Sequence, residues 1–209
     1  MRKFWGYLGG TIIKPYRTFN RLCADSHALQ LSFAAILFIG VLYTLTVIGL
    51  AIAGADISTP AWINIPAEEY YFCEIFFALP VYILGWILAA GIAQLLSRAF
   101  KGNGTFESTL ATLGFAITLP SFVTWIPETA GTILFLSGIM TQKEWQEIIA
   151  RPGFWQVFAN VYIFVGVAWY LALIPLAVAA SQKIRWWQSA ITGVVTTAII
   201  GFIMLVFIR

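Results

Sequence analysis

Residues Leu29 to Gly54, LQLSFAAILFIGVLYTLTVIGLAIAG, contain no charged side chain. A helix that crosses the hydrocarbon core of a bilayer needs about 20 mostly apolar residues, and this run is longer than that. Hydrocarbon offers no water to the backbone, so every N–H and C=O must be paired within the protein, and a helix does this locally. The stretch therefore predicts a membrane-spanning helix and an integral membrane protein.

The composition of the whole chain agrees with this prediction. The 209 residues are 60% hydrophobic and 10% charged, with a mean hydropathy of +0.86. A soluble domain carries about 25% charged residues, so this chain has too few to cover a water-facing surface. The net charge is only +3 and the basic residues form no single patch, so the sequence does not predict binding to nucleic acid.

Four further apolar segments are long enough to span a membrane. The first segment predicts a helix at about 29–54, and these four segments predict helices at about 71–97, 108–127, 156–182 and 186–208. The predicted fold class is an all-α integral membrane protein, with a bundle of five transmembrane helices at 29–209. A cytoplasmic, interfacial, amphipathic arm precedes it at 1–28.

The third span has an ambiguous end. A helix that continued through Pro127 and Glu128 to Met140 would be about 48 Å long, which exceeds a hydrocarbon core of about 30 Å. We expect a break at Pro127, with Thr129–Met140 on or dipping into the outer interface; interfacial, re-entrant and continuous arrangements remain open. Thr141 and Glu144 then fit a capping box for a short surface helix.

The placement of the basic residues predicts the orientation. Cytoplasmic loops of membrane proteins are enriched in Lys and Arg. Of the twelve basic residues, nine lie in the N-terminal arm and in the loops after the second and fourth helices. The prediction is a multi-pass protein of the cell inner (plasma) membrane, with a cytoplasmic N-terminus and an external C-terminus. The other three basic residues, Lys143, Arg151 and Arg209, fall on the outer side.

The residue pattern of the arm predicts a basic amphipathic element. Pro15 suits the first position of a helix, in which Phe19 lies opposite Arg17 and Arg21. Such an arm lies on the cytoplasmic leaflet, and Lys14, Arg17 and Arg21 are candidates to bind anionic lipids or a partner. The alternative is that these residues only fix the topology and pack on the surface.

Three polar residues within the spans are candidates for an intramembrane site. Glu74 is the only charged residue inside a predicted span, and intramembrane charges are costly and often functional. It lies about one turn from the outer end, where water or headgroups reach it, so a structural role is the alternative. Gln94 and Asn160 fit hydrogen bonds between helices, or a polar substrate path.

The loop before the third helix is rich in glycine. Gly102 and Gly104 permit a tight reversal, and Thr105 is a good N-cap for the helix that follows. The loop lacks the Lys-Ser/Thr ending of a phosphate-binding loop. A helix N-terminus at this depth is an alternative site for a lipid phosphate.

The sequence contains no recognisable catalytic or metal-binding set. His27 is the only histidine, and Cys23 and Cys73 fall on opposite sides of the predicted membrane. No nucleophile–base pair or metal-ligand spacing is present, so we expect no enzyme activity, cofactor or metal. Small residues recur every fourth position in the fifth helix and suit close packing within the bundle or, alternatively, a homo-oligomer. They are Ser189, Gly193, Thr197 and Gly201.

Several motifs follow one another in a recognisable order. The arm has a proline followed by a phenylalanine, the next cytoplasmic loop is glycine-rich, and the third helix carries a small–aromatic pair and a proline. The motifs are Lys14-Pro15-Tyr16-Arg17-Thr18-Phe19, Lys101-Gly102-Asn103-Gly104-Thr105-Phe106, Leu113-Gly114-Phe115-Ala116 and Pro120. With the five-helix layout, this order resembles the Yip domain, the fold of the Ypt/Rab-interacting membrane proteins and their prokaryotic relatives.

The resemblance covers most of the chain and implies membrane organisation rather than catalysis. Eukaryotic members interact with prenylated small GTPases and act in vesicle traffic. The Asp-Leu-Tyr-Gly-Pro-type segment of those members is absent here, so the chain looks like a prokaryotic-type member and we do not expect GTPase binding.

Three functional hypotheses remain. The first is a non-enzymatic membrane protein, with a role of the trafficking or organising kind, that associates with lipids or with other membrane proteins. The second is a small transporter or channel-like permease with a polar cavity between helices two, three and four. The third is a membrane enzyme acting on lipid, for which the sequence offers no convergent polar residues.

Overall fold

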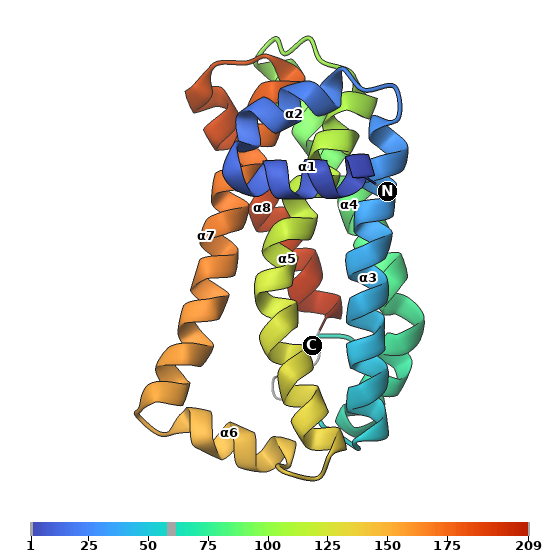
Figure 1. Ribbon diagram of the computed structural model, residues 1–209, viewed down its shortest axis with the longest axis vertical. Coiled ribbons are helices and arrows are strands. Elements are labelled where there is room, and N and C mark those ends of the chain that lie inside the picture. The colour runs from blue at the N-terminus through green and yellow to red at the C-terminus, as the bar shows by residue number, and fades with distance from the viewer. Residues whose placement is uncertain (1, 58–61, 209) are drawn as a thin grey trace.

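The computed structural model describes residues 2–57 and 62–208, and its regular elements there are all helical (Figure 1). All five long helices are long and apolar enough to cross a membrane, which confirms the predicted fold class. The long helices are α3 (Ala28–Ile52), α4 (Tyr70–Ala99), α5 (Phe106–Leu136), α7 (Phe154–Gln182) and α8 (Trp186–Phe207). The short elements are α1 (Arg2–Ile13), α2 (Pro15–Cys23), the 3-10 turn η1 (Ala67–Glu69) and α6 (Gln142–Ala150).

Helix α5 is the central helix of the bundle. Every residue from Thr109 to Ser121 is buried, and a helix that is covered on all sides is a core element. In Figure 1, α5 stands between α3 and α7, and it also contacts α4 and both arm helices. The outer helices instead expose large apolar side chains, such as Phe76 and Phe164, which suit contact with lipid.

The predicted break at Pro127 was wrong, because α5 continues through Pro120 and Pro127 to Leu136. At 1.5 Å per residue the helix is about 46 Å long. The length argument failed because protein, not lipid, surrounds the end of α5 that lies beside the arm helices. The arm helices pack there, so the helix extends beyond the hydrocarbon without exposing an apolar surface to water.

Helix α1 crosses the bundle close to the end that carries α2. The Phe4 ring lies 6.1 Å from that of Phe38 and 6.0 Å from that of Phe115, measured between centroids. Phe115 is about 14 Å along α5 from the start of the helix. Helix α1 therefore packs on α3 and α5 through Phe4, while Trp5, whose ring also lies beside that of Phe38, and Ile12 are exposed.

Helix α6 crosses the opposite end of the bundle (Figure 1). The predicted capping box is confirmed: the Thr141 hydroxyl accepts from the Glu144 backbone N–H, and the Glu144 carboxylate accepts from the Thr141 backbone N–H. From Phe115, beside α1, to the end of α5 at Leu136 the distance is about 32 Å. This is close to the thickness of a hydrocarbon core, about 30 Å, so α1 and α6 mark the two edges of the membrane-spanning part.

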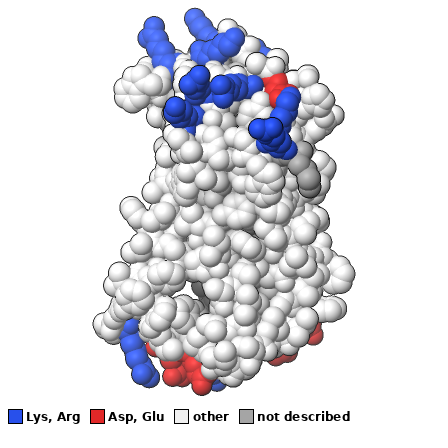
Figure 2. All heavy atoms as spheres, viewed as in Figure 1, with Lys and Arg blue, Asp and Glu red and all other residues white. Residues whose placement is uncertain are grey.

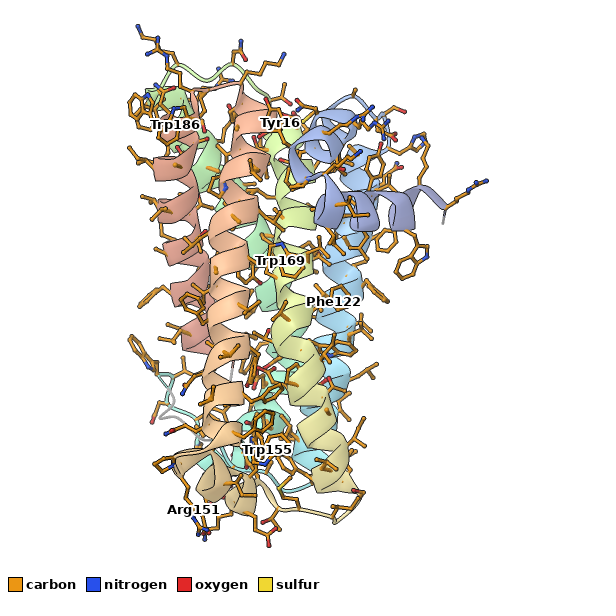
Figure 3. The ribbon with its side chains drawn as sticks, turned by 60° about the vertical axis from the view of Figure 1, so that its left-hand side comes forward. Tyr16, Phe122, Arg151, Trp155, Trp169 and Trp186 are labelled. Atoms are coloured by element: carbon orange, nitrogen blue, oxygen red, sulfur yellow. The ribbon has the colours of Figure 1, made fainter. Side chains whose placement is uncertain are left out.

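The charged residues divide between the two ends. In Figure 2 most Lys and Arg side chains gather at the end that carries α1 and α2, and Asp and Glu gather near α6. Figure 3 shows Tyr16 and Trp186 at the first end, and Arg151 and Trp155 at the other. Tryptophan and tyrosine favour the membrane interface, so these side chains agree with the two edges.

One of the small residues of α8, Gly193, allows close helix packing within the bundle. A Cβ added to Gly193 would lie 2.4 Å from Cγ of Pro175, so glycine lets α8 approach the proline of α7. Gly201 has open space around its Cα. The homo-oligomer alternative for this stripe stays a prediction.

Candidate functional site

The basic residues of the arm lie on an exposed face of α2. Phe19 and Leu22 are fully buried against the bundle, whereas Lys14, Arg17 and Arg21 are exposed on the side away from it. Pro15 occupies the first turn of α2, as predicted. The arm therefore presents cationic side chains outward, while its apolar side is held by protein.

Asp25 fixes the arm to the start of α3. Its carboxylate accepts hydrogen bonds from Nζ of Lys3 at 3.1 Å, from the Tyr7 hydroxyl at 2.9 Å and from the His27 backbone N–H at 3.0 Å. The His27 N–H and then the Lys3 ammonium hold the pKa of Asp25 well below its usual range. Burial, followed by the bond to Asp25, raises the pKa of Tyr7 to about 12. No sequence motif predicted this role of Asp25, although an acid within a basic arm was the available signal.

The glycine-rich loop packs tightly against the end of α7. A Cβ on Gly104 would lie 2.0 Å from the Ser181 carbonyl oxygen, and one on Gly102 would lie 2.9 Å from the Ser97 carbonyl oxygen. The Gly104 carbonyl accepts from Nε2 of Gln94 at 3.1 Å. Thr105 caps α5 as predicted, accepting from the Ser108 N–H at 3.2 Å. The role of this loop in holding a lipid phosphate stays a prediction.

A buried polar cluster joins three helices beneath that loop. The arm-end polar cluster consists of Gln94 on α4, Thr109 on α5, and Ser181 and Gln182 on α7. Gln182 is fully buried, and its Nε2 donates to Oε1 of Gln94 and to the Thr109 hydroxyl. Gln94 therefore makes the interhelical bonds predicted for it. Its partner Gln182 was missed, because no local pattern shows that two glutamines 88 positions apart meet.

The three polar residues predicted within the spans do not share one pocket. Gln94 lies at the end of the bundle that carries the arm, and Glu74 is about 30 Å away along the same helix. Asn160 lies in the half of α7 nearer α6, with an exposed side chain. Glu74 was expected within reach of water, but it is fully buried, and Oε1 accepts from the Tyr43 hydroxyl at 3.3 Å. The cavity predicted from these three residues is therefore not formed by them together.

Glu128 is a second carboxyl group within a span. The prediction placed it in a loop after Pro127, whereas the continuous α5 holds it about 12 Å from the C-terminal end of that helix. The charge of Glu128 marked it as a candidate in the sequence. The comparison of helix length with membrane thickness, however, predicted a break at Pro127 and so placed Glu128 outside the helix. Among residues 2–57 and 62–208, no cluster of three or more His, Cys, Asp or Glu side chains is placed to hold a metal ion.

Comparison with known proteins gives one positive finding. A family model described as the Yip1 domain matches residues 9–208, which is nearly the whole chain. No curated protein and no solved structure matches.

Proposed function

The chain belongs to the Yip1 domain family, and from this premise we propose that it is a non-enzymatic membrane-organising protein whose arm end binds anionic lipids. In this proposal the N-terminus lies in the cytoplasm and the C-terminus outside, following the bias of Lys and Arg toward the arm end. The alternative of a protein partner uses the same surface. The observation that supports the proposal most is the exposed basic face of α2, on a helix whose apolar side is already occupied by the bundle.

The geometry of the arm suits a lipid headgroup. An arm that was disordered before binding would lose conformational entropy when it folded on the membrane, and this loss would weaken its binding. Here Phe19 and Leu22 are buried in the bundle and hold α2 in place. Each Lys or Arg near an anionic membrane surface contributes about 1 kcal/mol of attraction. The same end also carries basic residues from the two neighbouring loops: Arg98, Lys101, Lys183 and Arg185.

The test measures which phospholipids stay bound to the purified full-length protein. The protein is equilibrated in mixed micelles of phosphatidylglycerol and phosphatidylcholine, and the ratio of bound lipids is read by native mass spectrometry. We expect the double variant Arg17→Gln, Arg21→Gln to lower that ratio roughly tenfold or more, because two attractions of about 1 kcal/mol each are removed. Adding Lys14→Gln should lower it further.

The matched control neutralises two basic residues at the other end. Lys143 and Arg151 are exposed near α6, and Lys143→Gln with Arg151→Gln removes the same charge. We expect this variant to keep the ratio of the unmodified protein. An unchanged ratio in the arm variant, or an equal fall in both double variants, would contradict lipid selection by the arm.

A further inference from the structure

A cavity opens at the α6 end of the bundle, opposite the basic arm. Its volume is about 370 Å³, which is within the range of pockets that hold small organic groups. Three segments line it: the chain after α3, the last turn of α5 with the loop that follows, and the first half of α6. In Figure 1 the ends of α3 and α5 lie at the same end of the molecule as α6. We call this space the α6 cavity.

Two glycine turns shape the α6 cavity. Gly54 follows α3 with a φ of +62°, and the Ala55 N–H donates to the Leu50 carbonyl at 3.1 Å, which closes the end of the helix. Gly138 follows α5 with a φ of +69°, and its N–H donates to the Phe135 carbonyl at 3.1 Å. Residues other than glycine rarely adopt such φ values. The chain therefore turns sharply at two places in the wall, and each turn leads into residues that line the cavity.

Two opposite charges line the α6 cavity without forming an ion pair. Asp56 comes from the chain after α3 and Lys143 from α6, and both residues are exposed. Among the described residues, neither has an ion-pair partner. Gln142 and Gln146 add amide groups to the lining. The cavity therefore offers a carboxylate, an ammonium and hydrogen-bonding amides, which suits a ligand that carries both a positive and a negative group.

The remainder of the lining is apolar, and exposed apolar side chains lie beside it. Ile57, Phe135 and Met140 are partly buried at the cavity. Leu136 and Ile139, which lie between lining residues in the chain, are 47% and 75% exposed. Because α6 marks one edge of the membrane-spanning part, these side chains lie where lipid headgroups meet acyl chains. An amphiphile therefore fits this place better than a fully soluble zwitterion does.

The carboxylate in the lining favours a primary ammonium group. Such a group has three N–H donors, and a hydrogen bond between ionised partners is about twice as strong as a neutral one. A trimethylammonium group has no N–H and cannot donate to Asp56. Proteins instead recognise it with cages of aromatic rings, and Phe135 is the single aromatic residue among the described residues of the lining. Ethanolamine is therefore favoured over choline.

We propose that the α6 cavity binds phosphoethanolamine as the headgroup of phosphatidylethanolamine, from the leaflet at the α6 end. The ammonium lies by Asp56 and the phosphate by Lys143, while the acyl chains extend past Leu136 and Ile139 into the membrane. The site lies at the opposite end from the basic arm and takes a zwitterion rather than an anionic lipid. Every phospholipid carries the phosphate that Lys143 contacts, so replacing Lys143 leaves the ratio of phosphatidylglycerol to phosphatidylcholine unchanged.

The experiment equilibrates the purified full-length protein in non-ionic micelles with equal amounts of phosphatidylethanolamine and phosphatidylcholine that have the same acyl chains. Native mass spectrometry reads the ratio of the two lipids in the complex that retains one lipid. We expect an excess of phosphatidylethanolamine on the unmodified protein. In Asp56→Asn the ratio should fall roughly tenfold, because the charged partner of the ammonium is lost. Asp56→Glu keeps the charge and should retain most of the preference.

A second measurement separates the lipid from its free headgroup. O-phosphoethanolamine has the same charged groups and no acyl chain, and it is added to the lipid-bound protein at the concentration of the lipid. We expect the phosphatidylethanolamine to stay bound, because the free compound makes no contact with the apolar side chains beside the cavity. Displacement of the lipid would assign the cavity to a soluble ligand and contradict the proposal.

The matched control is Glu147→Gln, which removes an exposed acid on α6 outside the lining. We expect it, and the arm variant Arg17→Gln, Arg21→Gln, to keep the ratio of the unmodified protein, so the two proposals fail separately. Equal binding of the two lipids by the unmodified protein, an unchanged ratio in Asp56→Asn, or an equal fall in Glu147→Gln would overturn the assignment. Thermal unfolding of each variant shows whether it is folded, and a folded Asp56→Glu with the ratio of Asp56→Asn would also overturn it.

Discussion

At the scale of single residues, the glycines of the loop between α4 and α5 serve close approach rather than an unusual backbone. Among the described residues, the glycines with positive φ are Gly54 and Gly138, so Gly104 has a φ that any residue adopts. Its missing Cβ matters because the Ser181 carbonyl occupies that space. The sequence correctly predicted a turn and a cap here, but not this contact with α7.

Replacing Gly104 tests the contact. In Gly104→Ala the new methyl group would lie 2.0 Å from a backbone oxygen, so the loop or α7 must shift. Overpacking of this kind costs about 1–3 kcal/mol, and we expect a lower midpoint of thermal unfolding for the purified protein. Gly9→Ala is the matched control, because nothing lies within 4 Å of its added Cβ and alanine favours a helix. A Gly104→Ala midpoint as high as that of Gly9→Ala would contradict the contact.

At the scale of elements, the arm is a folded part of the bundle. Thr11 of α1 and Phe19 of α2 are fully buried, and Asp25 ties α1 to the start of α3. The amphipathic pattern predicted that the arm lies flat, since apolar and basic residues alternate at helical spacing. It did not predict which surface would cover the apolar side, because lipid and protein select the same pattern.

The bonds to Asp25 predict a pH dependence for α1. The folded protein holds the pKa of Asp25 below its unfolded value of about 3.9, so the folded arm binds fewer protons than the unfolded one. This contribution to stability is complete above the unfolded pKa and falls as the pH drops below it. We expect the amides of α1 to lose protection from hydrogen exchange on acidification below that value, after correction for the intrinsic rate.

Asp25→Asn provides the comparison for this measurement. The amide keeps the size of the side chain but removes the charge that Lys3 and Tyr7 contact. We expect lower protection of α1 at neutral pH and little further change on acidification. If the unmodified protein and Asp25→Asn lost the same protection between neutral and acidic pH, another group would be responsible.

Helix α5 shows where element-scale rules fail. Pro120 and Pro127 favour kinks, and a helix of about 46 Å exceeds the hydrocarbon thickness. Both facts favoured a break, yet α5 is continuous. Neighbouring helices bury every residue from Thr109 to Ser121, including Pro120, and no single segment of sequence reveals that cover.

At the scale of the whole molecule, an odd number of spans places the two ends of the chain on opposite sides. Cys23, the last residue of α2, is exposed at the arm end, and Ser137, which directly follows α5, is exposed at the other end. Burial raises the pKa of the Cys23 thiol, so its labelling is best measured at a pH above neutral. These two positions report the orientation directly.

Labelling with a membrane-impermeant maleimide tests the orientation. In intact cells that carry Cys73→Ala, we expect Cys23 to react only after permeabilisation. In cells that carry Ser137→Cys with both native cysteines replaced by alanine, we expect reaction without it, because that end faces outward. Labelling of both positions in intact cells, or of Cys23 alone, would contradict the proposed topology.

The sequence by itself determined the solvent of this protein, its helical class and the division of its charges. Hydropathy and charge are properties of each segment alone, so Leu29–Gly54 predicted a span without knowledge of its neighbours. The tertiary structure decided which polar groups meet: Gln94 with Gln182, Asp25 with Lys3, and Glu74 with Tyr43. These contacts depend on how whole helices rotate and cross, and helix packing is set by many weak contacts distributed over the chain.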